Sequence, residues 1–188
     1  MLIEINKSNL ILIDVQEKLV SAMPKPHTFI DNIIKLQKAA RALGILQICS
    51  EQYPKGLGKT IKKIRENIVV PTSPDVDINK TLEEDSIREK TEFSFPPIEG
   101  LPDRDQLIIC GIEAHVCVLQ SAINLAKDKK VYVVQDAIAS RKEKDYLLSL
   151  NRLDKHPNIQ IVSCEMVLFE WLRTSDHPEF KTISQLIK

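Results

Sequence analysis

The sequence predicts an α/β protein with a parallel β-sheet and helices on both faces of that sheet. Short continuous apolar runs alternate along the chain with segments whose apolar residues recur at helical spacing. Continuous apolar runs are typical of strands that are buried on both faces, as strands in parallel sheets are. We expect one domain over residues 1–188, because the sequence has no internal repeat, low-complexity tract or long linker.

Three strands and two helices are expected in the first half of the chain. Gly44 ends a long amphipathic helix, and the prolines and glycines of Glu51–Gly58 indicate a polar loop. Within residues 67–86, a loop is expected at 71–75, and Thr81–Glu84 matches the pattern that caps a brief helix. In chain order, the expected elements are strand Asn9–Ile13, helix Phe29–Leu43, strand Ile45–Cys49, a short helix at Thr60–Glu66 and a short strand before Lys90.

The second half is expected to hold three further strands, each followed by a helix. Pro96–Pro102 indicates an exposed connection, and Gly111 is expected to end the central strand. The helix over 141–153 is expected to turn Tyr146, Leu147 and Leu150 inward. In chain order, the expected elements are strand Leu107–Cys110, helix Val116–Ala126, strand Val131–Val134, the helix over 141–153, strand Ile159–Val162, and helices Glu165–Leu172 and Phe180–Ile187.

Composition and charge argue against several classes of partner. Lys plus Arg and Asp plus Glu each number 26, and no basic cluster is interleaved with aromatic residues, so we expect no nucleic-acid partner. The sequence has no apolar run long enough to span a bilayer and no signal-peptide pattern at its N-terminus, so we expect no membrane partner. Its four cysteines are scattered without a C-x-x-C pair, which favours a reduced, cytoplasmic protein.

Cys117 is a candidate nucleophile because of where the pattern places it. It falls in the first turn of a helix that begins just beyond the central buried strand. Unpaired N–H groups at a helix start favour an anion, including a thiolate. The crevice beyond the strand ends of an open α/β sheet is also where ligands bind. The alternative interpretation is that Cys117 is a small buried hydrophobe, as a free cysteine commonly is.

Two charged residues are expected at the same edge of the sheet as Cys117. Asp14 ends the first strand, and Lys90 follows the third. Asp14 could accept the thiol proton, and Lys90 could stabilise negative charge on either group. Taken singly, Asp14 could instead cap a turn and Lys90 could be a solvated surface residue. Their placement with Cys117 at one edge favours a catalytic set.

Other catalytic arrangements find little support. His115 lies two positions from Cys117, and residues two apart on a helix do not face each other, so a Cys–His dyad is not expected. Neither Ser94 nor Ser163 lies in a G-x-S-x-G context. The sequence also contains neither G-x-G-x-x-G nor a Walker A pattern.

Three motifs in order make the chain resemble the isochorismatase-like cysteine hydrolases, and the resemblance covers nearly its whole length. They are Asp14-Val-Gln16, Lys90-Thr-Glu-Phe-Ser94 and Gly111-Ile-Glu-Ala-His-Val-Cys117-Val118. Further stretches are similar to the isochorismatase domain-containing protein branch of that family: Glu51-Gln-Tyr-Pro, Asp136-Ala-Ile-Ala-Ser-Arg141 and His177-Pro-Glu-Phe-Lys181.

The resemblance implies a three-layer α/β/α fold with a six-stranded parallel sheet in the order 3-2-1-4-5-6. It also implies an Asp-Lys-Cys triad, here Asp14, Lys90 and Cys117. Lys90 would reach the other two from two strands away, a gap of roughly 10 Å at about 4.8 Å per strand. A non-proline cis peptide bond is implied at Ile112–Glu113.

The resemblance further implies an amide hydrolase that works through a thioester. The backbone N–H groups of Glu113 and Cys117 would hold the oxyanion. Gln16, Tyr53 and Phe93, which stand within the motifs, are expected to line the substrate pocket. The expected substrate is a small amide or ureide.

We expect neither a metal nor another cofactor. Nicotinamidases of this superfamily carry an Asp-x-His motif after the second strand, whereas this chain has Cys49-Ser-Glu-Gln-Tyr-Pro-Lys55 there, without histidine.

Two further questions stay open. One alternative to the enzyme is a scaffold or binding protein that retains the fold; another is a redox role for Cys117, although no resolving cysteine lies nearby. The apolar segment Met166–Leu172 suggests either a homo-oligomer interface or an ordinary closing helix.

Overall fold

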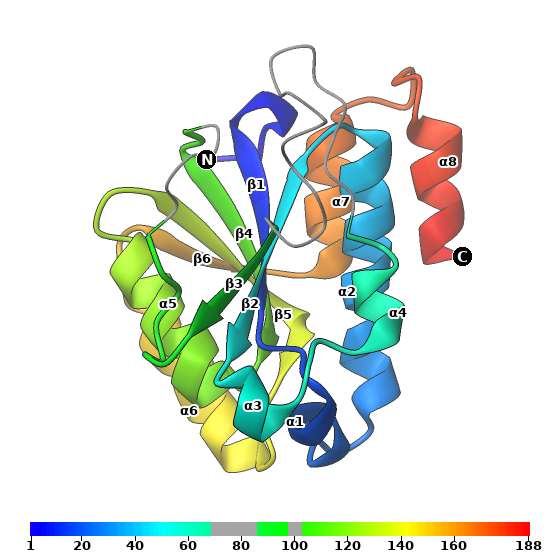
Figure 1. Cartoon of the computed structure of the whole chain (residues 1–188). Coiled ribbons are helices and arrows are strands. Elements are labelled where there is room, and N and C mark those ends of the chain that lie inside the picture. The colour runs from blue at the N-terminus through cyan, green and yellow to red at the C-terminus, as the bar shows by residue number, and fades with distance from the viewer. Residues whose placement is uncertain (69–85, 98–102) are drawn as a thin grey trace.

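The computed structural model describes residues 1–68, 86–97 and 103–188. These residues form a three-layer α/β/α structure around a six-stranded parallel sheet in the order β3-β2-β1-β4-β5-β6 (Figure 1). The fold class and the strand order expected from the sequence are thus confirmed. The loop at 71–75, the helix cap at 81–84 and part of the connection at 96–102 lie outside the described residues.

The strands β1 and β4 lie at the centre of the sheet, and every residue in them is buried. Their continuous apolar sequences explain this position, because each contacts a layer of helices on both faces. The bounds of the strands are β1 (Ser8–Ile13), β2 (Leu46–Gln52), β3 (Ile87–Lys90), β4 (Gln106–Ile112), β5 (Lys130–Ala139) and β6 (Ile159–Val162).

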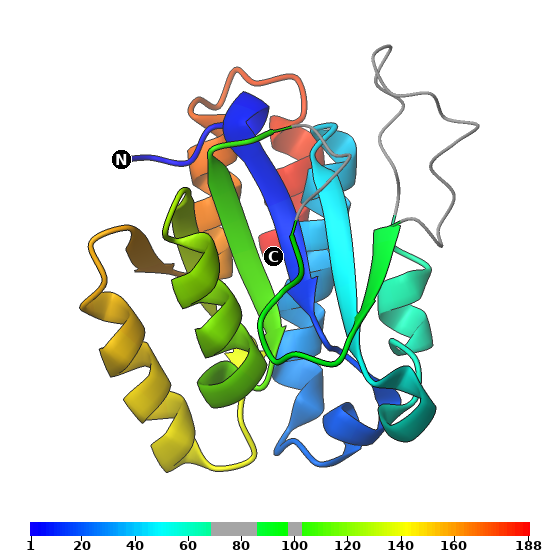
Figure 2. The same cartoon turned by 60° about the vertical axis from the view of Figure 1, so that its left-hand side comes forward.

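Two helical layers cover the sheet. Figures 1 and 2 show α2 and α7 on one face, with α8 beyond them, and α5 and α6 on the other. No helix of the described residues is both long and apolar enough to cross a membrane. The helices are α1 (Glu17–Ser21), α2 (Pro26–Ala42), α3 (Pro54–Leu57), α4 (Lys62–Arg65), α5 (Leu119–Leu125), α6 (Glu143–Asp154), α7 (Cys164–Leu172) and α8 (Phe180–Ser184). Shorter turns are η1 (Ile5–Lys7), the π-helical η3 (Ala114–Val118) and η4 (Gln185–Ile187).

Three strands extend further than the sequence predicted. β2 continues to Gln52 and β5 to Ala139, because neighbouring parallel strands continue to pair with them. The expectation that Gly111 ends the central strand is wrong: β4 continues to Ile112, and Gly111 pairs with Ile13. Gly111 has φ +121°, and a Cβ there would lie 2.1 Å from the Ile13 carbonyl oxygen. Glycine therefore allows β1 and β4 to approach closely at the end that carries Asp14.

Two expectations about helix faces are settled by burial. Leu147 on α6 is 56% exposed instead of turned inward, because the buried face of this helix carries Ser149 and Leu153. The apolar segment of α7 is mainly a closing helix whose buried side chains pack on the sheet, while Met166 and Phe169 remain exposed.

Candidate active site

Asp14 sits immediately after β1, with its side chain fully buried. Its backbone has φ +48°, a left-handed conformation that aspartate tolerates better than most residues. Ser50 on β2 fixes the carboxylate, because its Oγ donates a hydrogen bond of 2.6 Å to Asp14 Oδ1. The Asp14 N–H in turn donates to the Ser50 carbonyl oxygen at 3.2 Å.

Lys90 is the last residue of β3, and its side chain crosses the end of β2 to reach Asp14. Its Nζ lies 2.7 Å from Asp14 Oδ2, and the two side chains are 3% and 0% exposed. The same Nζ donates to the Glu92 and Phe93 carbonyl oxygens at 3.2 and 3.3 Å. The lysine therefore spans the two-strand gap as expected and neutralises a carboxylate that would be costly to bury alone.

Cys117 lies in η3, the π-helical turn that follows β4, and is 6% exposed. Burial raises the pKa of its thiol to about 12; the charge and hydrogen bonding of Asp14 add to the rise, and Lys90 opposes it. Burial of the thiol therefore acts against the thiolate that the helix start was expected to favour. The structure does bring the thiol together with Asp14 and Lys90.

The turn before Cys117 has the backbone form implied by the resemblance. The Ile112–Glu113 peptide bond is cis. The buried Glu113 carboxylate accepts hydrogen bonds from the Arg141 backbone N–H at 3.0 Å and from Arg141 Nε at 3.1 Å. This fastens the turn to the chain after β5. An oxyanion role for the Glu113 and Cys117 N–H groups stays a prediction.

Gln16 does not line the cavity beside Lys90. Its side chain is fully buried, and its Nε2 donates to the carbonyl oxygens of Gln52 and Gly58 at 3.0 and 2.6 Å. Its Oε1 accepts from the Gln52 N–H at 2.8 Å. Gln16 therefore holds the end of β2 and the chain after α3, with its amide fully engaged by backbone groups.

Gln52 is a site residue that the sequence analysis missed. Its Oε1 accepts from Lys90 Nζ at 2.7 Å, while its Nε2 donates to the Thr91 carbonyl oxygen at 2.7 Å. The sequence could have indicated Gln52 through strand alternation: Ser50 and Gln52 are two apart on one strand, so both face the side of the sheet that carries Cys117. Because β2 was predicted to end at Cys49, that alternation was not applied.

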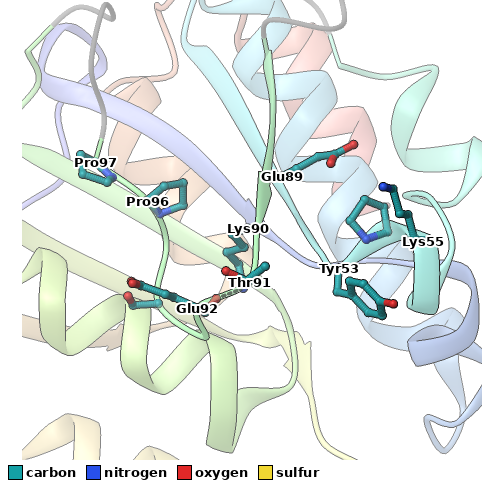
Figure 3. A pocket seen from close by; sticks show the side chains of 10 residues that line it. Tyr53, Lys55, Glu89, Lys90, Thr91, Glu92, Pro96 and Pro97 are labelled. Atoms are coloured by element: carbon teal, nitrogen blue, oxygen red, sulfur yellow. Dashed lines mark hydrogen bonds between the residues drawn. The ribbon is translucent and has the colours of Figure 1, made fainter.

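A cavity of about 650 Å³ opens beside Lys90, between α3 and the segment 91–97 (Figure 3). Tyr53 lines it and is 57% exposed. Phe93 is 52% exposed but is not among the residues that line this cavity. In Figure 2, the chain leaving β3 passes in front of β1; it is fastened to α5, where the Phe95 N–H donates to Ser121 Oγ at 2.8 Å.

His115 points away from the triad, as the sequence analysis expected. Its Nδ1 lies 3.0 Å from Ser140 Oγ, and its Nε2 lies 4.0 Å from Asp145 Oδ2. Across residues 1–68, 86–97 and 103–188, no group of three or more His, Cys, Asp or Glu side chains is arranged to hold a metal ion.

The geometry agrees with a family match. Residues 8–165 match the family model described as "Isochorismatase domain". The chain belongs to the isochorismatase family. It is 34% identical over 181 residues to isochorismatase domain-containing protein 2 of Danio rerio, covering 96% of this chain and 86% of that protein.

Solved structures agree with this membership. A MAR1 ribonuclease from Caenorhabditis elegans has a TM-score of 0.83 and 32% identity, covering 100% of this chain and 92% of its own. An octameric hydrolase of unknown specificity from Escherichia coli has a TM-score of 0.79 at 19% identity, covering 100% of this chain and 89% of its own, and shows the fold alone. The isochorismatase-like hydrolase fold therefore extends across the chain.

Proposed function

We propose that this isochorismatase-family protein is a metal-independent cysteine hydrolase that cleaves a C–N bond of a small amide or ureide. The observation that carries the proposal is the buried Lys90–Asp14 ion pair of 2.7 Å beside the Cys117 thiol. A carboxylate beside a thiol can act as its general base, and the thiol is the nucleophile.

The raised pKa of Cys117 defines the role of Asp14 as the general base that removes the thiol proton. With a pKa of about 12, the thiol keeps its proton at neutral pH, so the nucleophile has to form during the attack. Asp14 accepts the proton from Sγ as sulfur bonds to the substrate carbonyl carbon. The Lys90 ammonium group, 2.7 Å from Asp14 Oδ2, compensates the buried negative charge of the carboxylate before the transfer.

The remaining steps return each proton to its place. The carbonyl π electrons move to oxygen, and the backbone N–H groups of Glu113 and Cys117 hold the resulting oxyanion. As the C–N bond breaks, the protonated Asp14 gives its proton to the leaving amine and a thioester remains on Cys117. Water then loses a proton to Asp14 and attacks the thioester; the acid leaves, and the sulfur recovers its proton.

Trapping the acyl-enzyme tests this proposal. The protein is mixed with a panel of small amides, ureides and imides, quenched in acid and measured by intact mass. We expect an adduct on the wild-type chain and on Cys164→Ala, but none on Cys117→Ala. Turnover of any panel member by Cys117→Ala at the wild-type rate would contradict the proposal, as would the absence of any adduct across the panel.

RNA cleavage is a second candidate, favoured by the similarity to the Caenorhabditis elegans protein described as a ribonuclease. The equal numbers of basic and acidic residues speak against it, because RNA binding relies on phosphate neutralisation. Incubation with labelled single-stranded RNA decides between them: Cys117-dependent cleavage of RNA in place of amides would favour this alternative.

We further propose a reducing location and a homo-oligomer. The four cysteines are unpaired and buried, which fits the cytoplasm. The exposed Met166 and Phe169 of α7 offer an apolar patch for a second copy, and a similar fold is octameric in the Escherichia coli hydrolase. Light scattering that finds only monomer at micromolar concentration would reject the oligomer.

A further inference from the structure

Tyr53 is held in an unusual backbone conformation directly beside the triad network. Its φ is +37°, a region that bulky residues rarely adopt. Its N–H donates to the Lys90 carbonyl oxygen at 2.9 Å, and its own carbonyl oxygen accepts from the N–H groups of Gly56 and Leu57. Such a conformation costs free energy and persists only where its surroundings fix it.

The Tyr53 ring rests on a glycine. A Cβ added to Gly56 would lie 2.3 Å from the ring atom Cε1 and 2.4 Å from Cδ1, so the ring occupies the space of a side chain at that position. Two bonds hold this support in place: Lys18 Nζ donates to the Gly56 carbonyl oxygen at 2.7 Å, and Gln16 Nε2 donates to that of Gly58 at 2.6 Å. The ring is therefore fixed before any ligand arrives.

The fixed ring is still 57% exposed, and it lines the cavity beside Lys90 (Figure 3). Its hydroxyl makes no hydrogen bond to the described part of the chain. A single exposed aromatic residue is common on protein surfaces and needs no explanation. Tyr53, however, combines a rare backbone conformation, packing of its ring against a glycine and a position that lines a cavity. Rigid, exposed tyrosine rings bind ligands at low entropic cost.

We propose that Tyr53 is a stacking platform by which the cavity beside Lys90 selects substrates that carry a flat, π-bonded group. This inference rests on the proposed function, because it takes the cavity that Tyr53 shares with Lys90, and that Cys117 does not line, as the place where the flat group of the substrate binds. A saturated, puckered group of the same size meets the ring with less contact and without favourable ring–ring geometry.

Binding of two matched amides tests the platform without turnover. In a Cys117→Ala background, affinities for benzamide and cyclohexanecarboxamide are measured by ligand-observed NMR titration. We expect benzamide to bind more tightly. Tyr53→Leu should weaken benzamide binding about two- to tenfold, the range expected for losing an aromatic pair, and should change cyclohexanecarboxamide binding less than twofold.

Three further variants separate stacking from a general loss of structure. Tyr53→Phe keeps the ring and should keep the preference for benzamide. Gly56→Ala keeps the tyrosine but places a methyl group where the ring lies, so it should lose the preference. Leu147→Ala changes an exposed apolar side chain on α6 that does not line the cavity, and it should have no effect. An unchanged preference in both Tyr53→Leu and Gly56→Ala, with thermal unfolding like that of the parent, would overturn the inference.

A single-stranded RNA hexamer, titrated in parallel, identifies the source of the flat group. Tyr53-dependent binding of the hexamer alone would make the group a nucleobase. No Tyr53-dependent binding of either benzamide or RNA would overturn the platform, even if acyl-enzyme forms on Cys117. Tyr53-dependent binding without any acyl-enzyme would instead overturn only the proposed hydrolysis.

Discussion

Cys117 and Cys164 lie in equivalent places in the fold, yet their surroundings differ. Each follows a strand at the carboxyl edge of the sheet and stands at the start of a helical segment. Each thiol has a pKa raised to about 12, mainly by burial; Asp14 adds to the rise at Cys117, Asp136 and Glu165 add to it at Cys164, and one lysine opposes it in each case. Position and pKa therefore do not distinguish the two cysteines.

The two sites differ in the hydrogen-bond partners of the carboxylate and the lysine that lie near each thiol. Near Cys164, the Asp136 carboxylate accepts from the Cys164 backbone N–H at 2.8 Å, and the thiol donates to the Asn32 carbonyl oxygen at 3.6 Å. Lys35 donates to the Asn32 side chain instead of pairing with Asp136. At Cys117, the carboxylate and the lysine pair directly and both act on the thiol. Of these two cysteines, Cys117 is the one whose neighbouring carboxylate also forms a hydrogen bond with the thiol, as a proton acceptor must.

The largest contrast is expected from removing each carboxylate. Asp14→Asn should slow thioester formation by about 10²–10⁴-fold, because it removes the general base. Asp136→Asn should leave that rate unchanged, because Asp136 caps α7. Single-turnover kinetics on a confirmed substrate measure both. The double variant Asp14→Asn/Cys117→Ala should be little worse than Cys117→Ala alone. Wild-type turnover in Asp14→Asn would make this residue structural.

A smaller but clear contrast is expected in stability. Lys90→Met leaves the fully buried Asp14 carboxylate without its cation and should lower the free energy of unfolding by about 3–5 kcal/mol. Lys35→Met removes a single hydrogen bond and should cost about 1 kcal/mol or less. Urea unfolding measures both. Lys90→Met should also impair turnover, and full activity in that variant would reject the triad.

The rate of alkylation by iodoacetamide should show whether Asp14 and Lys90 each raise or lower the pKa of the Cys117 thiol. With a pKa of about 12, its rate should rise about tenfold per pH unit from pH 7 to 10 without a plateau, since only the thiolate reacts. Asp14→Asn removes a cause of the raised pKa and should shift this profile to lower pH, giving faster alkylation at pH 8. Lys90→Met should do the opposite. Peptide mapping should show Cys117 labelled before Cys164; the reverse order would contradict an accessible site.

The smallest expected effect is that of metal removal. A chelator should leave the hydrolysis rate unchanged, because the proposed steps use only side-chain and backbone groups of this chain. Elemental analysis provides the complementary measurement. Stoichiometric zinc whose removal abolishes activity would contradict the metal-independent mechanism.

The order of strands and helices together with the three motifs was sufficient to place Asp14, Lys90 and Cys117 at one edge, because each ends or follows a strand at the carboxyl edge of the sheet. It could not show the role of Gln52 or the direction of the Cys117 pKa shift. The role of Gln52 depends on its contacts with Lys90 and the Thr91 carbonyl oxygen, and the pKa of Cys117 depends on how far the folded chain buries the thiol; both arise only from tertiary packing. The prediction that Gly111 ends its strand failed for a related reason. Glycine is needed there because β1 and β4 pair so closely that a Cβ would meet Ile13, and neither sequence segment alone shows that pairing.

The many bonds of Lys90 have a consequence for how activity could be lost during descent. This one ammonium group joins β1, the end of β2 and the chain after β3, so replacing it disturbs the architecture as well as the chemistry. The Cys117 thiol supports no comparable set of contacts. A lineage that abandons hydrolysis would therefore be expected to lose the cysteine first and keep the aspartate and lysine. In such a lineage the ion pair alone would indicate retained structure, whereas the proposed hydrolysis would also require the thiol.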